Sequence, residues 1–138
     1  MEQLELINAV KRGDIDSVKM LLAHGADVNA REGDLYGWTA LLYATEKHRT
    51  EIVKALLGKG ADPNIGGLNN GRTALINASK LGLSDIVEAL IAGGADVSTR
   101  DNAGKTALSE ASRQLRESSG YIGYKVIIQL LKQAGAVE

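Results

Sequence analysis

The feature that most constrains this chain is an internal repeat. Gly-Ala-Asp occurs at 25–27, 60–62 and 94–96, and a truncated Gly135-Ala136 follows near the end. Thr-Ala-Leu runs in step with it at 39–41, 73–75 and 106–108, and a glycine stands two positions before each copy. Two markers that keep the same register indicate a stack of similar supersecondary units rather than one irregular core.

Each unit is predicted to be a pair of helices joined by a turn. A segment rich in small residues follows each Thr-Ala-Leu, and an apolar pattern with helical spacing comes next, such as Ile52, Val53 and Leu56. The glycine that opens each Gly-Ala-Asp stands where a helix ends in a left-handed residue, which glycine adopts without steric cost. Asn69-Asn70-Gly71 and Asn102-Ala103-Gly104 predict tight turns between units.

This combined pattern resembles the ankyrin repeat family, in which Gly-x-Thr-Pro-Leu-His precedes paired alanines, a turn glycine, Ile-Val, Leu-Leu and Gly-Ala-Asp. Residues 68–100 match it best, through Gly71, Thr73, Leu75, Ala78, Gly82, Ile86, Val87, Leu90 and Gly94-Ala95-Asp96. The resemblance implies an all-α fold, an ankyrin-repeat solenoid of four stacked helix-turn-helix repeats joined by β-hairpin-like fingers. We expect one domain over 1–138, with repeats at about 1–33, 34–67, 68–100 and 101–138 and a polar cap at each end.

Two departures from the family pattern are local. His48 stands in the place of a turn glycine, where a left-handed conformation costs a non-glycine residue about 1 kcal/mol. The interval from Thr106 to Gly135 is eight residues longer than the matching interval in the two repeats before it. We therefore expect an insertion near 115–122, either as variation in a loop or as a dedicated site, because loops carry function more often than cores do.

Composition excludes several classes of partner. Sixteen basic residues nearly balance seventeen acidic ones, so no net field attracts nucleic acid or an anionic membrane. The apolar runs are far shorter than the roughly 20 residues that span a bilayer. The absence of cysteine fits a reducing compartment, and the acidic start at Met1-Glu2 has no secretory pattern. We expect a cytoplasmic monomer that binds neither nucleic acid nor membrane.

Candidate catalytic groups all have simpler structural explanations. His24 and His48 fall at helix ends or turns without the spacing of metal ligands. Gly66-Gly67 and Gly93-Gly94 lack the lysine and the fixed glycine spacing of a phosphate-binding loop. No serine lies in a nucleophile turn. We predict no enzyme activity, no cofactor and no metal site.

The resemblance to ankyrin repeats instead implies protein binding on a concave face made of finger tips and inner helices. By register, the candidate partner-binding residues are Leu35, Tyr36, Trp38, Tyr43, Glu46, Asn69, Asn70, Arg72, Asn77, Lys80, Lys105, Glu110 and Arg113. Tyr36, Trp38 and Tyr43 are expected to cluster as a hot spot, since aromatic side chains dominate interface energetics.

Alternatives stay open at this stage. Trp38 can instead pack over the neighbouring finger. The segment Gly-Trp-Thr-Ala-Leu is similar to one in a nucleotide-sensing member of the family, which favours small-ligand or nucleotide sensing through the Trp38 region. A structural or engineered scaffold without a native partner is the third alternative.

Overall fold

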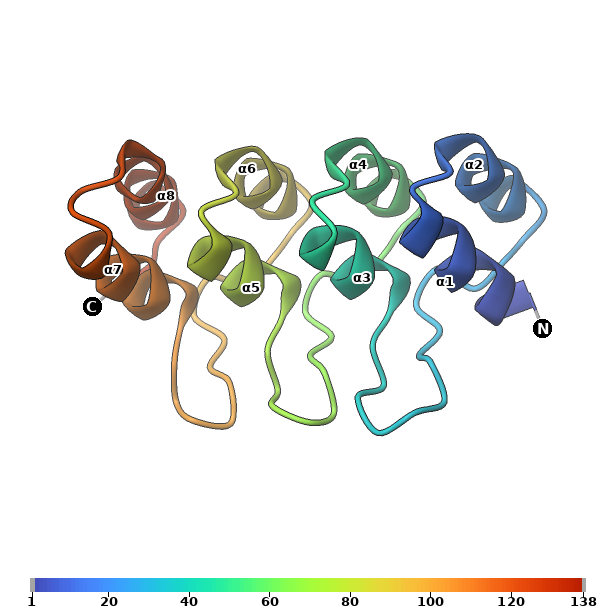
Figure 1. Ribbon diagram of the computed structural model, residues 1–138, viewed down its shortest axis with the longest axis horizontal. Coiled ribbons are helices and arrows are strands. Elements are labelled where there is room, and N and C mark those ends of the chain that lie inside the picture. Colours follow the sequence, from blue (N-terminus) through green and yellow to red (C-terminus); the bar gives the residue numbers. More distant parts are fainter. Residues whose placement is uncertain (1, 138) are drawn as a thin grey trace.

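The computed structural model describes residues 2–137, so Met1 and Glu138, the two ends of the predicted domain, lie outside the described residues. The described part contains eight helices: α1 (Glu2–Arg12), α2 (Ile15–Ala23), α3 (Ala40–Glu46), α4 (Thr50–Gly58), α5 (Ala74–Leu81), α6 (Ser84–Ala92), α7 (Ala107–Glu117) and α8 (Ile122–Gln133). They pair in order into four stacked units, with α1, α3, α5 and α7 in one row and α2, α4, α6 and α8 in a second row, drawn above the first (Figure 1). The all-α repeat solenoid is confirmed.

We call α1, α3, α5 and α7 the inner helices and α2, α4, α6 and α8 the outer helices. Each inner helix after the first has the threonine of Thr-Ala-Leu as its N-cap. The hydroxyls of Thr39, Thr73 and Thr106 accept hydrogen bonds from backbone N–H groups three residues later, which satisfies donors that have no partner inside the helix. The turn after α3 has a left-handed residue at His48, with φ of 58°, where the turn after α5 has Gly82 with φ of 77°. The predicted strain at His48 is therefore present.

The inner and the outer helices both contribute side chains to one continuous core along the array. The inner helices bury alanines: Ala40, Ala44, Ala74, Ala78, Ala107 and Ala111. The outer helices bury branched residues: Ile52, Val53, Leu56, Ile86, Val87, Leu90, Ile127 and Leu131. Alanine lets neighbouring inner helices approach closely, while the branched side chains fill the space between layers.

Three connections between units project from the inner row as fingers (Figure 1). The first finger has one antiparallel bridge, between Arg31 and Thr39. Adjacent fingers are tied by hydrogen bonds: the N–H of Leu68 donates to the carbonyl of Tyr36 at 2.8 Å, and the N–H of Asn102 donates to the carbonyl of Asn70 at 2.9 Å. The finger tips are therefore positioned relative to each other by the backbone.

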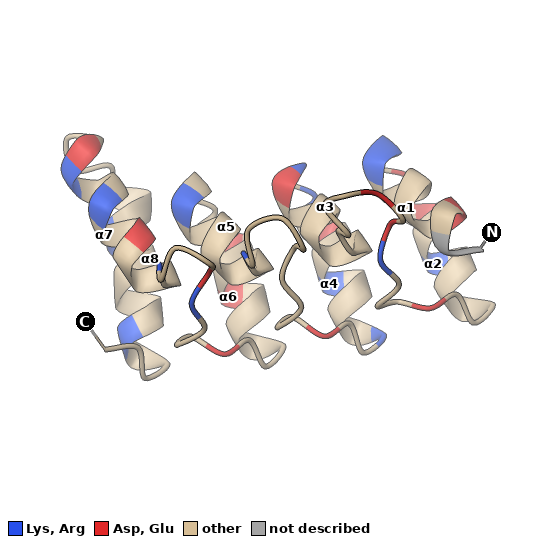
Figure 2. Ribbon diagram, turned by 90° about the horizontal axis from the view of Figure 1, so that it is seen from below, with Lys and Arg blue, Asp and Glu red and all other residues tan. Residues whose placement is uncertain are grey.

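The extra residues of the fourth unit lengthen its first helix and the loop that follows. Helix α7 has 11 residues, against 7 in α3 and 8 in α5. Its tip and the loop over 118–121 extend beyond the ends of α3 and α5 (Figure 2). The hydroxyl of Tyr124 donates to the carbonyl of Lys80 at 2.9 Å, which ties α8 to the end of α5.

No helix within residues 2–137 is both long enough and apolar enough to cross a membrane.

Candidate partner-binding surface

The fingers and the inner helices α1, α3, α5 and α7 lie on one side of the array, which we call the inner face (Figure 2). Six of the predicted residues are exposed there: Leu35, Tyr36, Glu46, Asn69, Lys80 and Lys105. Six others are partly buried: Trp38, Tyr43, Asn70, Arg72, Asn77 and Arg113. Glu110 is buried.

Trp38 and Tyr43 form a ring pair that is held from several sides. Their centroids lie 5.1 Å apart, with the planes tilted by 58°. The ammonium of Lys11 lies 4.5 Å from the centre of the Tyr43 ring and also pairs with Glu32, at 3.1 Å. Burial, and the hydrogen bond that the Tyr43 hydroxyl donates to Glu32, raise the pKa of Tyr43 above its usual range. Tyr43 therefore stays neutral and fixed in place.

Trp38 packs against the next finger, as the alternative interpretation of this residue expected. A Cβ atom added to Gly67 would lie 2.9 Å from Nε1 of Trp38, so the indole lies directly over that glycine. Tyr36 has no ring contact with Trp38 or Tyr43 in the described residues. The expected three-ring hot spot is thus a ring pair of Trp38 and Tyr43 in the structure, and Tyr36 is a half-exposed side chain of the first finger.

Part of the exposed apolar surface lies at the tips of the first two fingers. Leu35 is 87% exposed, Tyr36 52% and Leu68 62%. The backbone hydrogen bond from Leu68 to Tyr36 joins the two fingers, and the Leu68 side chain covers Gly37, which has a positive φ of 56°. We call Leu35, Tyr36 and Leu68 the finger ridge. Sequence reasoning missed Leu68, although a lone leucine in the glycine- and asparagine-rich turn over 65–71 was a signal.

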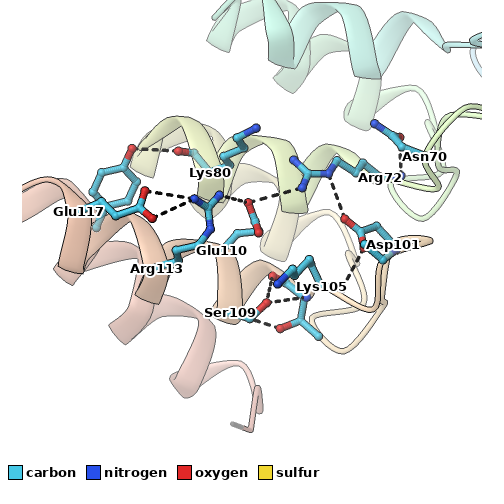
Figure 3. A network of polar contacts seen from close by, with 12 residues as sticks. Asn70, Arg72, Lys80, Asp101, Lys105, Ser109, Glu110, Arg113 and Glu117 are labelled. Atoms are coloured by element: carbon cyan, nitrogen blue, oxygen red, sulfur yellow. Dashed lines mark hydrogen bonds and ion pairs between the residues drawn. The ribbon is translucent and has the colours of Figure 1, made fainter.

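A network of charges joins the third and fourth units (Figure 3). Arg72 contacts Asp101 at 3.0 Å and Glu110 at 3.6 Å. Arg113 contacts the same Glu110 oxygen at 3.0 Å and Glu117 at 3.1 Å. The prediction that Glu110 lies on an exposed helix face is therefore wrong. Its side chain is 1% exposed because α7 packs against α5, and two guanidinium groups compensate its charge.

Hydrogen bonding keeps both ends of this network charged. Burial alone would raise the pKa of Asp101, but backbone N–H groups of Lys105 and Ala103 and the Arg72 guanidinium outweigh it and hold the pKa below the usual range. Hydrogen bonding to Glu110 raises the pKa of Arg113. The arginines are thus fixed by carboxylates of this chain.

Comparison with known proteins decides the family. The family model described as ankyrin repeats in three copies matches residues 4–67. The model of the single ankyrin repeat matches residues 70–102. The chain belongs to the ankyrin repeat family. Ankyrin repeats are generally protein–protein interaction modules and generally not enzymes.

Related proteins share the repeats over part of their length. The chain is 51% identical over 59 residues to the 2-5A-dependent ribonuclease of Mus musculus, which covers 43% of this chain and 8% of that protein. It is 44% identical over 61 residues to the mitochondrial disaggregase of Bos taurus, covering 44% and 9%. Ankyrin repeat domain-containing protein 40 of Homo sapiens is 38% identical over 64 residues, covering 46% and 17%. The matched segments are thus a small part of these relatives.

Within this ankyrin array, Lys80 and Lys105 are exposed cations of the inner face that have no ion pair in the described residues. Lys80 lies at the end of α5, and Lys105 precedes the N-cap of α7. Glu46, at the end of α3, is likewise exposed and unpaired. Among residues 2–137, no group of three or more metal-binding side chains is close enough to hold an ion.

Proposed function

We propose that this ankyrin array is a non-enzymatic protein-binding module that uses its inner face. The observation that carries the proposal is the finger ridge, three large apolar side chains left exposed on fingers that hydrogen bonds hold in place. Exposed apolar patches on a soluble domain mark interaction sites, and positioning them in advance lowers the entropic cost of binding.

The test uses the exposed ridge rather than Trp38 and Tyr43, because those two rings also support the fold. The chain and a Leu35→Asp plus Leu68→Asp variant are immobilised and compared in capture of partners from cell extract. We expect the variant to lose the captured proteins while keeping its helical circular dichroism.

A matched control places the same change on exposed apolar residues away from the fingers, Met20→Asp plus Ile122→Asp. Equal capture by the ridge variant and the parent chain would contradict the proposal. Loss of capture by the control alone would place the interaction on another surface.

A second candidate function is nucleotide sensing through the Trp38 region. The observation that favours it is the similarity to a ribonuclease whose name states dependence on 2-5A. Trp38 is the only tryptophan, so its fluorescence reports directly on this region. A saturable change on titration with 2-5A would support nucleotide sensing, and an unchanged spectrum would contradict it. A scaffold without a partner is the outcome if neither experiment finds a ligand.

The same proposal includes repeat boundaries at about 34, 68 and 101, a monomeric state and a cytoplasmic location. Light scattering tests the monomer, and fractionation of the source cell tests the location. Deletion of residues 101–138 should leave a shorter helical array, because each repeat in such a stack contacts only its neighbours.

A further inference from the structure

We propose that the partner is a polypeptide segment that is apolar where it meets the finger ridge and acidic where it crosses the third and fourth repeats. This inference rests on the proposed function and names the chemistry of the partner at the same surface. Two independent observations carry it: the apolar surface at the finger tips and the imbalance of free charge along the inner face.

The apolar end of the partner follows from the finger ridge. Leu35, Tyr36 and Leu68 stand together on two adjacent fingers, and all three are at least half exposed. The second finger, residues 65–71, has no charged side chain (Figure 2). A polar partner would bury these side chains without apolar contacts, so an apolar anchor fits this end best.

The acidic end of the partner is inferred from which charged side chains of this surface already have a partner and which do not. The carboxylates of Asp101 and Glu110 are buried beneath Arg72, which both of them contact. Lys80 and Lys105 are exposed and have no carboxylate partner in the described residues. The unbalanced charge that an approaching partner meets on the third and fourth repeats is therefore positive.

The arginines of this surface do not add to its free positive charge, because carboxylates of this chain already pair with them. Glu110 and Glu117 pair with the Arg113 guanidinium, and Arg72 pairs with Asp101 and Glu110 (Figure 3). The free positive charge of the third and fourth repeats is therefore that of Lys80 and Lys105. A basic segment or a second copy of this face would meet like charges here, and nucleic acid would leave the apolar ridge uncovered.

A library of random peptides displayed on phage is the probe, selected against the immobilised full chain. We expect the enriched peptides to combine large apolar side chains with a net negative charge from Asp and Glu. Enrichment of neutral or basic peptides, or no enrichment above an uncoated surface, would overturn the inference.

Variants then locate each half of the selected peptide. Lys80→Gln plus Lys105→Gln should weaken binding about 3- to 10-fold at low salt and reduce its salt dependence, because two exposed charge pairs are lost. Leu35→Asp plus Leu68→Asp should weaken it more than 10-fold, since an apolar anchor would then face two carboxylates.

The control, Lys19→Gln plus Lys59→Gln, removes two exposed cations from the neighbourhood of the outer helices and should leave affinity unchanged. An equal loss in this control would overturn the assignment of the acidic end. Peptides that bind the inner face but carry no acidic residues overturn only this inference. Acidic peptides that ignore every inner-face variant overturn the proposed function as well.

Discussion

Glu110→Gln is the substitution that most directly tests how the last repeat is attached. It removes a negative charge that is 1% exposed and lies 3.0 Å from Arg113 and 3.6 Å from Arg72. The glutamine has nearly the same shape, so the change removes charge without opening a cavity. What is lost is the compensation of two guanidinium groups at the junction between α5 and α7.

The magnitude follows from burial and from what each arginine keeps. Removing one partner of a fully buried ion pair costs about 3–5 kcal/mol. Here Arg72 keeps Asp101 at 3.0 Å, the partly exposed Arg113 keeps Glu117 at 3.1 Å, and the amide oxygen still accepts a hydrogen bond. We therefore expect a loss of about 2 kcal/mol, in the range of one hydrogen bond to a charged group. For a domain of this size the midpoint of thermal unfolding falls by roughly 6–10 °C.

Urea denaturation followed by circular dichroism measures the loss, and hydrogen exchange locates it. Because each repeat contacts only its neighbours, amides of α7 and α8 should exchange faster while those of α3 and α4 change little. Glu117→Gln is the control: it breaks an exposed contact with Arg113 at 3.1 Å and should leave the midpoint nearly unchanged. Equal effects of the two substitutions would refute the assigned role of the buried carboxylate.

Three further predictions concern backbone strain and pH. His48→Gly should raise the free energy of unfolding by about 0.5 kcal/mol and so raise the urea midpoint, because His48 has φ of 58° and glycine adopts it freely at some entropic cost; a lower midpoint would contradict this. Gly37→Ala should cost about 1 kcal/mol more than Gly104→Ala in the same assay, since both have positive φ but only the first Cβ would overlap Leu68; equal costs would mean that the leucine moves aside freely. Asp101 contributes stability that is present above its unfolded-state pKa, ordinarily 3.8, and is lost as the pH falls through its lower folded-state pKa, so Asp101→Asn should flatten an acid titration of stability.

Sequence reasoning works well here for features that depend on a few neighbouring residues. The segments after Thr-Ala-Leu were predicted to be helices, and they are, because the threonine hydroxyl caps the helix through a backbone N–H only three residues later. The strain at His48 followed from alignment with Gly82. The repeated period made the helix pairs and their stacking predictable, because each unit must bury its apolar stripe against the next.

The surface itself was less predictable. Register placed Glu110 beside Asn77 and Tyr43 as an exposed helix position, yet Glu110 is buried with two arginines. The same register put Tyr36 with Trp38, but the ring contact of Trp38 in the described residues is with Tyr43. Side-chain direction at a finger tip depends on the turn and on the next finger, which a single repeat does not contain.

The sequence alone determined the family, the helical pairs, their stacking order and the place of the extra residues, since these follow from periodic apolar positions and from local turn chemistry. Only the tertiary structure decided which polar and apolar side chains remain free. Leu68 joins the finger ridge through a hydrogen bond to Tyr36, and Glu110 is neutralised by Arg72 of the preceding repeat. Both contacts connect different repeats, and such pairings arise from how two units pack rather than from the pattern within either one.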